Sequence, residues 1–276
     1  MNNFILRSIS GIVYLAAILL SLTIHPLIFA LLFAVFIFMM MREYFALSIP
    51  NSFKTGKVLS IISGLSIFCV TFFHYYKGLD LKFLLLSLLP ILFIFISVLY
   101  KNNKEEYNLH PWLISAIIYI ALPVSLYNSI IFDSAGEFSG WLLLGLFIIQ
   151  WLYDIGAYIF GTAFGQVNGH RLFPSISPKK SWEGVIGGSL ITIIAAIILS
   201  LIGLSPFSTT HSILIAVIIS LFGTLGDLVE SQIKRNFGVK DSGNIMPGHG
   251  GMLDRLDSAL ISIPVAIIYI RLLDLI

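Results

Sequence analysis

The sequence predicts an all-α, polytopic integral membrane protein, and its composition and the pattern of its apolar runs carry that prediction. Hydrophobic residues make up 58% of the 276 residues, charged residues only 11%, and the mean hydropathy is +0.97. These values lie far outside the soluble range, so the lipid bilayer is the main solvent of the chain. The apolar runs are close to the length of a membrane helix and lack the alternation of strands, which favours helices over a closed barrel.

Nine apolar runs are read as membrane helices, in the order in which they occur. They cover residues 8–24, 27–46, 57–73, 82–100, 111–132, 141–160, 185–203, 211–229 and 256–274. The first is interpreted as an uncleaved helix, because no small-residue cleavage site follows it. We expect a single membrane domain over residues 1–276, with anchor helices in residues 1–135 and catalytic helices and cytoplasmic loops in residues 136–276. The second, third and fourth runs are rich in Phe and Leu and predict lipid-facing anchors.

The distribution of lysine and arginine predicts the orientation of these helices. With nine spans, thirteen of these residues fall on the side that carries the N-terminus and three on the other side. Positive residues concentrate on the cytoplasmic side, so we expect a multi-pass protein of the cell (inner) membrane with a cytoplasmic N-terminus and the C-terminus outside. Both long polar loops, residues 161–184 and 230–255, then face the cytoplasm.

Acidic residues inside the apolar runs predict a polar site. Asp154 lies in the sixth run and Asp227 near the cytoplasmic end of the eighth, while Asp254 and Asp257 open the ninth. An ionised Asp at a helix centre costs about 2.5–3.5 kcal/mol on insertion scales, so such residues usually have a partner and a function. We expect Asp254 and Asp257 on one helical face, and no intramembrane acid in the N-terminal half. A neutral, hydrogen-bonded structural role remains the alternative for Asp154 and Asp227, and favourable charge at a helix N-terminus for Asp254 and Asp257.

The spacing after Asp227 predicts a continuous polar face. Asp227, Glu230, Ser231 and Lys234 follow a spacing of i, i+3, i+4 and i+7, which places them together if the helix continues. Crowded carboxylates repel one another unless a cation lies between them or one of them is protonated. Oxygen ligands without His or Cys favour magnesium, commonly held by one or two carboxylates together with substrate phosphates.

Two loops add groups that suit phosphates. The run PGHGG at residues 247–251 contains His249, Gly250 and Gly251, and its glycines allow backbone N–H groups to face an anion, although a surface turn would look the same. The other loop contains Lys179 and Lys180, followed by Ser181, which is a candidate N-cap of the seventh span. Both lysines also fit an ordinary positive-inside loop. The glycines at 184, 187 and 188 predict close helix packing.

The segment from Ser231 to Asp257 resembles the signature of the phosphatidate cytidylyltransferases, also called CDP-diacylglycerol synthases. The matching positions are Ser231, Lys234, Arg235, Lys240, Asp241, Gly243, Pro247, His249, Gly250, Gly251, Asp254, Arg255 and Asp257. Met246 stands where the family usually has Leu, Ile or Phe, which is an apolar exchange of similar size. The runs SPKKSWEG (177–184) and DIGAYIFG (154–161) resemble the family as well, so the match covers roughly the C-terminal half.

The resemblance implies transfer of the cytidylyl group of CTP to phosphatidate with magnesium, giving CDP-diacylglycerol and pyrophosphate. On this reading, metal ligands come from Asp227, Asp254 and Glu230, with Asp257 in support. Phosphates are expected to contact Lys234, Arg235, Lys240 and Arg255, and a turn shaped by His249, Gly250 and Gly251. The remaining substrate-binding residues are expected to be Ser177, Lys179, Lys180 and Asp154.

The expected partners are CTP, phosphatidate and the lipid bilayer, with no nucleic acid, and the resemblance leaves a homodimer open. One rival function is an ion-coupled transporter that uses Asp154 and Asp227, but this rival does not explain the dense cytoplasmic run of Lys, Arg and Asp. Another is a different CTP-dependent lipid phosphotransferase, such as a lipid kinase. A CDP-alcohol phosphotransferase is disfavoured because the usual Asp-Gly-x-x-Ala-Arg start of its motif is absent from the sequence.

Overall fold

The chain forms two compact units. A computed structural model describes residues 3–50, 52–99, 107–133, 135–166, 169–246, 248 and 250–276. The first unit comprises Met1–Leu142 with Asp241–Leu256, and the second comprises Leu143–Lys240 with Asp257–Ile276. One boundary lies close to the predicted division at residue 135. The segment Asp241–Leu256, which we expected among the catalytic C-terminal elements, packs with the N-terminal helices instead.

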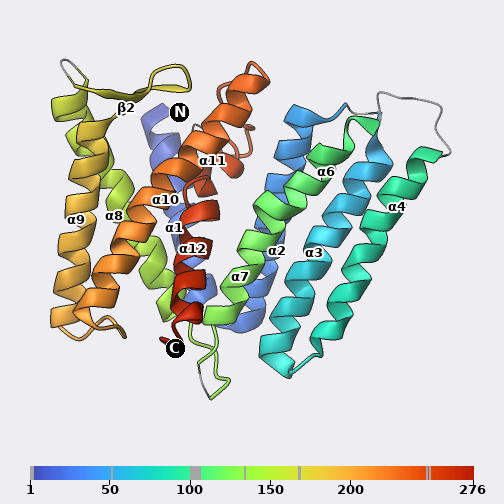
Figure 1. The fold of residues 1–276 in the computed structure, drawn as a ribbon, viewed down its shortest axis with the longest axis horizontal. Helices are drawn as coiled ribbons and strands as arrows, with labels where there is room; N and C mark the ends of the chain where they lie inside the picture. Colours follow the sequence, from blue (N-terminus) through green and yellow to red (C-terminus); the bar gives the residue numbers. More distant parts are fainter. Residues whose placement is uncertain are drawn as a thin grey trace. The chain divides into compact units, whose positions relative to one another are not determined.

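The first unit consists of helices (Figure 1). They are α1 (Asn3–Thr23), α2 (Pro26–Ser48), α3 (Lys54–Lys77), η1 (Leu81–Ser87), α4 (Leu88–Leu99), α6 (His110–Ala116), η2 (Ile117–Ala121), α7 (Leu122–Leu126), η3 (Tyr127–Ile130) and α11 (Leu253–Leu256). Local sequence sets several ends. His25 caps α2 by accepting a hydrogen bond from the N–H of Leu27 at 3.1 Å. Gly78 ends α3 in a left-handed conformation, with φ of 71°.

An aromatic core joins α2 and α3 in the first unit. The rings of Phe29 and Phe33 lie 4.5 Å apart between centroids, and Phe68 lies 6.3 Å from Phe29. Phe33 meets the fully buried Tyr127 edge-on at 5.8 Å. Such offset and edge-to-face pairs stabilise a core beyond the apolar area that they bury. One face of α2 therefore packs against protein rather than lipid, unlike the plain anchor that we expected.

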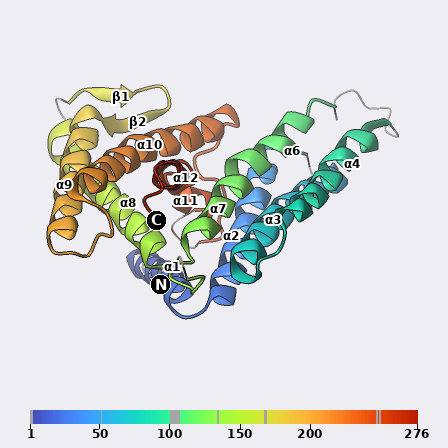
Figure 2. The same ribbon diagram turned by 60° about the horizontal axis from the view of Figure 1, so that its bottom comes forward.

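The second unit contains helices and an antiparallel hairpin (Figures 1 and 2). Its elements are α8 (Trp141–Phe160), η4 (Gly161–Gly165), β1 (Arg171–Phe173), β2 (Ser177–Ser181), α9 (Trp182–Leu201), α10 (Thr209–Asn236) and α12 (Ala259–Leu272). The antiparallel strands pair Arg171 with Ser181 and Phe173 with Ser177. Ser181 then caps α9, accepting a hydrogen bond from the N–H of Gly184 at 3.2 Å, which confirms the predicted N-cap.

Glycines bring the backbones of α8 and α9 close together, as the sequence predicted. A Cβ atom added at Gly184 would lie 2.8 Å from the carbonyl oxygen of Ala157. One added at Gly188 would lie 2.9 Å from both the N atom of Ala157 and the carbonyl oxygen of Tyr153. Small residues permit this approach, and van der Waals packing of this kind drives helix association in lipid.

The helices confirm the prediction of an all-α, multi-pass membrane protein, but not the count of nine spans. Within the described residues, seven helical segments are long and apolar enough to cross a membrane. The other two predicted spans coincide with shorter elements, Leu81–Ser97 and α12. Helix α12 has 14 residues, which at 1.5 Å per residue is shorter than the hydrocarbon core of about 30 Å. Helix α12 begins three residues after the predicted start at residue 256, because a turn at Asp257 and Ser258 separates it from α11.

The packing of α8 on α9 yields a stability prediction. Gly188→Ala places a methyl group against fixed backbone, and overpacking of this kind typically costs about 1–3 kcal/mol. We expect a lower midpoint in the thermal unfolding of the detergent-purified protein. Gly145→Ala in α8 is the matched control, because a Cβ atom there meets nothing within 4 Å. Equal midpoints for the two variants would contradict this account of the α8–α9 contact.

Candidate active site

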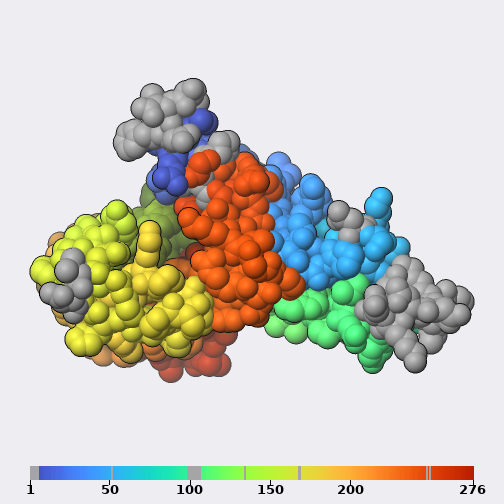
Figure 3. Space-filling model, turned by 90° about the horizontal axis from the view of Figure 1, so that it is seen from above, coloured from blue at the N-terminus to red at the C-terminus, as the bar shows by residue number. Residues whose placement is uncertain are grey.

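A cavity of about 360 Å³ lies at the hairpin end of the second unit. Residues of α8, β2, α9 and α10 and the turn before α12 line it, and its size suits a small-molecule site. The hairpin lies against the end of α10, as the space-filling view shows (Figure 3) and as a hydrogen bond from Nε of Arg235 to the carbonyl of Ile176 requires. The charged residues of the lining are Asp154, Lys179, Lys180, Asp227 and Asp257.

Lys180 and Asp227 form an ion pair in the cavity. Nζ of Lys180 lies 2.6 Å from Oδ2 of Asp227 and donates to the carbonyl of Thr224 at 3.3 Å. The side chains are 22% and 33% exposed, so the pair stays open to a ligand from the cavity. An ammonium with three donors can exchange the carboxylate for a phosphate oxygen at the same position.

A buried amide orients Asp154. Gln150, 2% exposed, donates from Nε2 to Oδ1 of Asp154 at 3.1 Å. Its Oε1 accepts from the hydroxyl of Ser262 at 2.6 Å, which fixes the direction of the amide. Gly223 makes room for this side chain, since a Cβ atom there would lie 2.7 Å from Oε1 of Gln150. The Ser262–Gln150–Asp154 chain thus joins two helices, α12 and α8, and holds the carboxylate at the cavity wall.

Asp257 brings a third carboxylate to the same cavity. It lies within electrostatic range of Asp227, Asp154 and Lys180, and its Oδ1 accepts from the N–H of Ser258 at 2.7 Å. Among the described residues, no group of three or more His, Cys, Asp or Glu side chains is arranged to hold a metal ion by itself. The carboxylates nevertheless fit the hard-oxygen chemistry of magnesium, which commonly takes one or two protein carboxylates and completes its shell with phosphates and water.

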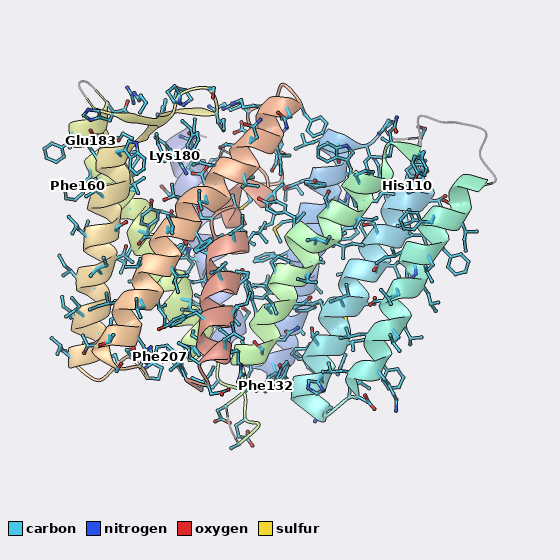
Figure 4. All side chains as sticks on the ribbon, in the orientation of Figure 1. His110, Phe132, Phe160, Lys180, Glu183 and Phe207 are labelled. Atoms are coloured by element: carbon cyan, nitrogen blue, oxygen red, sulfur yellow. The ribbon has the colours of Figure 1, made fainter. Side chains whose placement is uncertain are left out.

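The hairpin is anchored so that its lysines reach the cavity. The N–H of Trp182 donates to the carbonyl of His170 at 2.9 Å, and the N–H of His170 donates to Oε1 of Glu183, also at 2.9 Å. In Figure 4, Lys180 and Glu183 lie at the same end of α9. Lys179, Lys180 and Ser177 all belong to β2 and all line the cavity, so the structure unites the three residues that we predicted from this loop.

The predicted polar face of α10 is present, but part of it lies away from the cavity. The helix continues to Asn236, and the hydroxyl of Ser231 donates to Oδ1 of Asp227 at 3.2 Å. Glu230 is fully buried and forms an ion pair with Lys234 one turn later. Neither Glu230 nor Lys234 is in the cavity lining, so the structure offers no metal position for Glu230 at this cavity.

Two further cations that we predicted to bind phosphate, Arg235 and Lys240, lie at and after the end of α10. Arg235 donates from its guanidinium to the carbonyls of Ile176 and Val239, at 3.3 and 2.9 Å, and so ties the hairpin to the end of α10. Lys240, the last residue before the first unit's loop, is exposed. Neither side chain lines the cavity.

In the first unit, Asp254 organises the loop of residues 241–252, which precedes α11. Its Oδ2 accepts from the N–H and the hydroxyl of Ser242, each at 2.9 Å, and from the N–H of Gly251 at 2.8 Å. Asp254 lies in α11, whereas Asp257 lies in the turn after it. The single helical face expected for these two acids is therefore not formed, and it is Asp257 that lines the cavity of the second unit.

The glycine-rich turn has the backbone conformation that the sequence predicted. Gly248 and Gly250 have φ of 74° and 86°, in the left-handed region that favours glycine. A Cβ atom at Gly250 would also lie 2.6 Å from Oδ2 of Asp254. Arg255 is exposed, and its carbonyl accepts from the hydroxyl of Tyr14 at 3.4 Å. The predicted roles of His249 and Pro247 fall on positions outside the described residues.

Sequence analysis missed the residues of the N-terminal helices that contact this loop. Nε of Arg7 donates to the carbonyl of Gly248 at 2.7 Å. Glu43 of α2, 5% exposed, accepts from the N–H groups of Met252 and Leu253. The expectation that the N-terminal half holds no intramembrane acid was wrong, because Glu43 lies inside the second apolar run. An acid within that run was the signal that could have found it.

Comparisons with known proteins identify the family of this chain. The chain matches the cytidylyltransferase family over residues 5–273. It is 33% identical over 263 residues to a phosphatidate cytidylyltransferase of Staphylococcus saprophyticus subsp. saprophyticus, covering 94% of this chain and 95% of that protein. A protein of the same name from Staphylococcus aureus (strain COL) is 39% identical over 181 residues, covering 64% of this chain and 66% of the relative. The chain therefore belongs to the cytidylyltransferase family.

Proposed function

We propose that this chain transfers the cytidylyl group of CTP to phosphatidate in phospholipid biosynthesis, releasing pyrophosphate and forming CDP-diacylglycerol. The observation that carries the proposal is the cavity, in which two lysines and three carboxylates meet at the ends of apolar helices. Family membership and the names of the relatives support the same reaction.

The reaction needs orientation and charge neutralisation more than a strong base. A phosphate oxygen of phosphatidate attacks the α-phosphorus of CTP and forms the new P–O bond. The bond from the α-phosphorus to the bridging oxygen breaks, and its electron pair leaves with pyrophosphate. Since the nucleophile is already an anion, catalysis rests on bringing two repelling anions together and stabilising charge on the transferring phosphoryl group.

The cations of β2 are suited to the phosphates of CTP. Lys179 and Lys180 are adjacent in β2 and both line the cavity, and Ser177 adds a hydroxyl donor from the same strand. Lys180 lies on Asp227 in the free protein, so a phosphate that takes the ammonium releases this carboxylate toward the cavity. Asp154, oriented by Gln150, then orients a lysine or a water molecule.

We propose magnesium as the cofactor, held by Asp227 and Asp257 at the cavity. When bound, the ion supplies positive charge that neutralises the phosphates of the reactants. The metal role that we expected for Asp254 stays a proposal, and its Oδ2 also accepts hydrogen bonds from Ser242 and Gly251. Glu230 is better described as the partner of Lys234.

The remaining polar residues of the signature segment take supporting roles in this proposal. Lys240 and Arg255 are exposed cations that suit the outer phosphates or the lipid headgroup. Arg235 holds the hairpin, and Gly250 and Gly251 shape the turn beside Asp254. We also propose that the protein lies in the cell membrane with its N-terminus and the cavity facing the cytoplasm. The excess of lysine and arginine on that side indicates this orientation, and the cytoplasm supplies CTP.

The direct test of the function is incorporation of labelled CTP into lipid by the purified protein with added phosphatidate, with and without magnesium. We expect a labelled lipid with the mass of CDP-diacylglycerol, and release of one pyrophosphate per product, only when magnesium is present. A phosphorylated lipid without the cytidine would instead identify a CTP-dependent lipid kinase. Ion flux in reconstituted vesicles without any lipid product would identify a transporter.

Asp227→Asn tests the carboxylate that pairs with Lys180. The substitution keeps the size of the side chain but removes its charge, and we expect product formation to fall at least about 100-fold, comparable to the loss of one preorganised electrostatic contact. The control is Asp274→Asn, since Asp274 has a positive φ of 47° that Asn also tolerates. Near-wild-type turnover of the Asp227 variant at equal protein levels would remove this residue from the site.

Lys179→Ala tests the hairpin as a nucleotide contact. Hydrogen bonds to charged groups contribute about 1.5–3 kcal/mol, so we expect the KM for CTP to rise roughly 10- to 100-fold while the protein still folds. Lys82→Ala is the control, because Lys82 is a 68% exposed residue that pairs with Asp80 in an exposed salt bridge. Unchanged kinetics for the Lys179 variant would mean that the lysines of this loop only follow the positive-inside rule and do not contact CTP.

A further inference from the structure

We propose that Glu43 is a positioning residue for the reaction. Its buried carboxylate, on membrane helix α2, holds the loop of residues 241–252 and the start of α11, and through them it fixes Asp254. The proposal rests on the proposed function for its catalytic consequence. Its structural content, a carboxylate that sets the conformation of the loop, can be tested independently of the reaction.

Glu43 accepts two backbone hydrogen bonds from this part of the chain, and a hydroxyl group lies within hydrogen-bond distance of it. The N–H of Met252 donates to Oε1 at 2.8 Å, and the N–H of Leu253 donates to Oε2 at 2.8 Å. The hydroxyl of Ser242 lies 3.2 Å from Oε2. Both oxygens of one side chain thus contact groups about 200 positions later in the sequence, and they satisfy two backbone donors that the loop itself does not satisfy.

Two glycines of the signature segment make room for this carboxylate. A Cβ atom at Gly251 would lie 2.5 Å from Oε2 of Glu43, and one at Gly243 would lie 2.9 Å from Oε1. Neither glycine has a positive φ, so backbone conformation does not require glycine at these positions. The close approach of Glu43 supplies the physical reason at Gly243. At Gly251 it does so together with the hydroxyl of Ser242, which a Cβ atom there would approach even more closely.

Ser242 connects Glu43 to Asp254. Its hydroxyl lies between the two carboxylates, 3.2 Å from Oε2 of Glu43 and 2.9 Å from Oδ2 of Asp254, and can donate its proton to either. Its N–H donates to the same Oδ2, and so does the N–H of Gly251. Glu43 and Asp254 therefore both contact this short loop, and a shift of either carboxylate changes the environment of the other.

The surroundings of Glu43 argue against an incidental role. The neighbouring residues Met40, Met41, Tyr44 and Phe45 of α2 are buried and mostly apolar. Burying a carboxylate in such surroundings is unfavourable unless its oxygens are hydrogen-bonded, and an apolar side chain would pack at least as well. The N–H groups of the loop offset the cost of burying this carboxylate, so Glu43 and the loop depend on each other.

Glu43→Gln tests the proposal with little change in volume. One end of the amide is a donor, so it must face the N–H of Met252 or of Leu253 and cannot accept from it. Tyr44→Phe is the matched control, because it removes a buried hydrogen bond of 2.7 Å, to Ser115, from the next residue of the same helix without touching the loop. Both variants are made in the full chain. They are compared in detergent at temperatures equally far below their unfolding midpoints.

The first readout is amide hydrogen exchange of the peptides that contain residues 242–253. Loss of a hydrogen bond to a charged group predicts exchange at least about tenfold faster at this loop in Glu43→Gln, with α3 and α10 unchanged. Tyr44→Phe should leave the loop at the wild-type rate. Wild-type exchange in Glu43→Gln, or equal loosening in both variants, would overturn the proposal. If Glu43→Gln does not fold, Ser242→Ala decides in the same way, with faster loop exchange supporting it and wild-type exchange overturning it.

The second readout separates positioning from mere stability. We expect Glu43→Gln to lower kcat about 10- to 100-fold at saturating CTP, with a smaller change in KM, because the cations of β2 that would bind the nucleotide are not altered. Combining it with Ser242→Ala should cost less than the sum of the single effects, since both act on one network. Additive effects, or a wild-type kcat, would contradict the positioning role. If the wild-type protein forms no CDP-diacylglycerol, the proposed function fails, while the exchange experiment still decides whether Glu43 holds the loop.

Discussion

The constraint on which this structure depends is that a charge inside an apolar protein must find its partner within the protein. In hydrocarbon no water compensates an unpaired carboxylate or ammonium, so each one is expensive unless a neighbouring group satisfies it. Charged residues form only 11% of the chain, and three acids in its helices show three kinds of partner. Asp227 pairs with Lys180, Asp154 accepts from Gln150, and Glu43 accepts from backbone N–H groups.

These partnerships also prepare the chemistry that we propose. A carboxylate held by a lysine or an amide has a fixed direction before a ligand arrives, so less reorganisation is needed at the moment of reaction. Lys180 has a second role in such a scheme, because the same ammonium neutralises Asp227 in the free protein and can contact phosphate when CTP binds. The groups that make charge tolerable in the membrane are thus the groups that can handle anionic substrates.

The two units contribute different parts of the polar chemistry, and the N-terminal helices shape the glycine-rich loop. The second unit supplies the cavity with its lysines and three carboxylates. The first unit shapes the glycine-rich loop, with Arg7 holding Gly248 and Glu43 holding the start of α11. A chain segment that matches the family signature therefore depends on helices that lie far away in sequence and that look, by composition, like simple anchors.

Much of the fold was predictable because its causes are local or compositional. Runs of apolar residues identify membrane helices, and Ser181 caps α9 because its hydroxyl reaches a nearby N–H group. The polar face of α10 follows from helical periodicity, and the glycines of α9 pack closely on α8 as expected. The predicted count of nine spans was not confirmed within the described residues, and hydropathy does not reveal where a helix such as α12 begins.

The sequence by itself determined the membrane class, the reaction family and the set of polar residues available for it, because these depend on composition and on a motif with many fixed positions. Only the tertiary structure decided how these residues are distributed. It placed Asp257 rather than Glu230 in the cavity, gave Oδ2 of Asp254 to the loop, and brought Glu43 to the signature segment. Contacts between residues some 200 positions apart leave no local pattern in one sequence, since they arise when helices pack and buried charges find their partners.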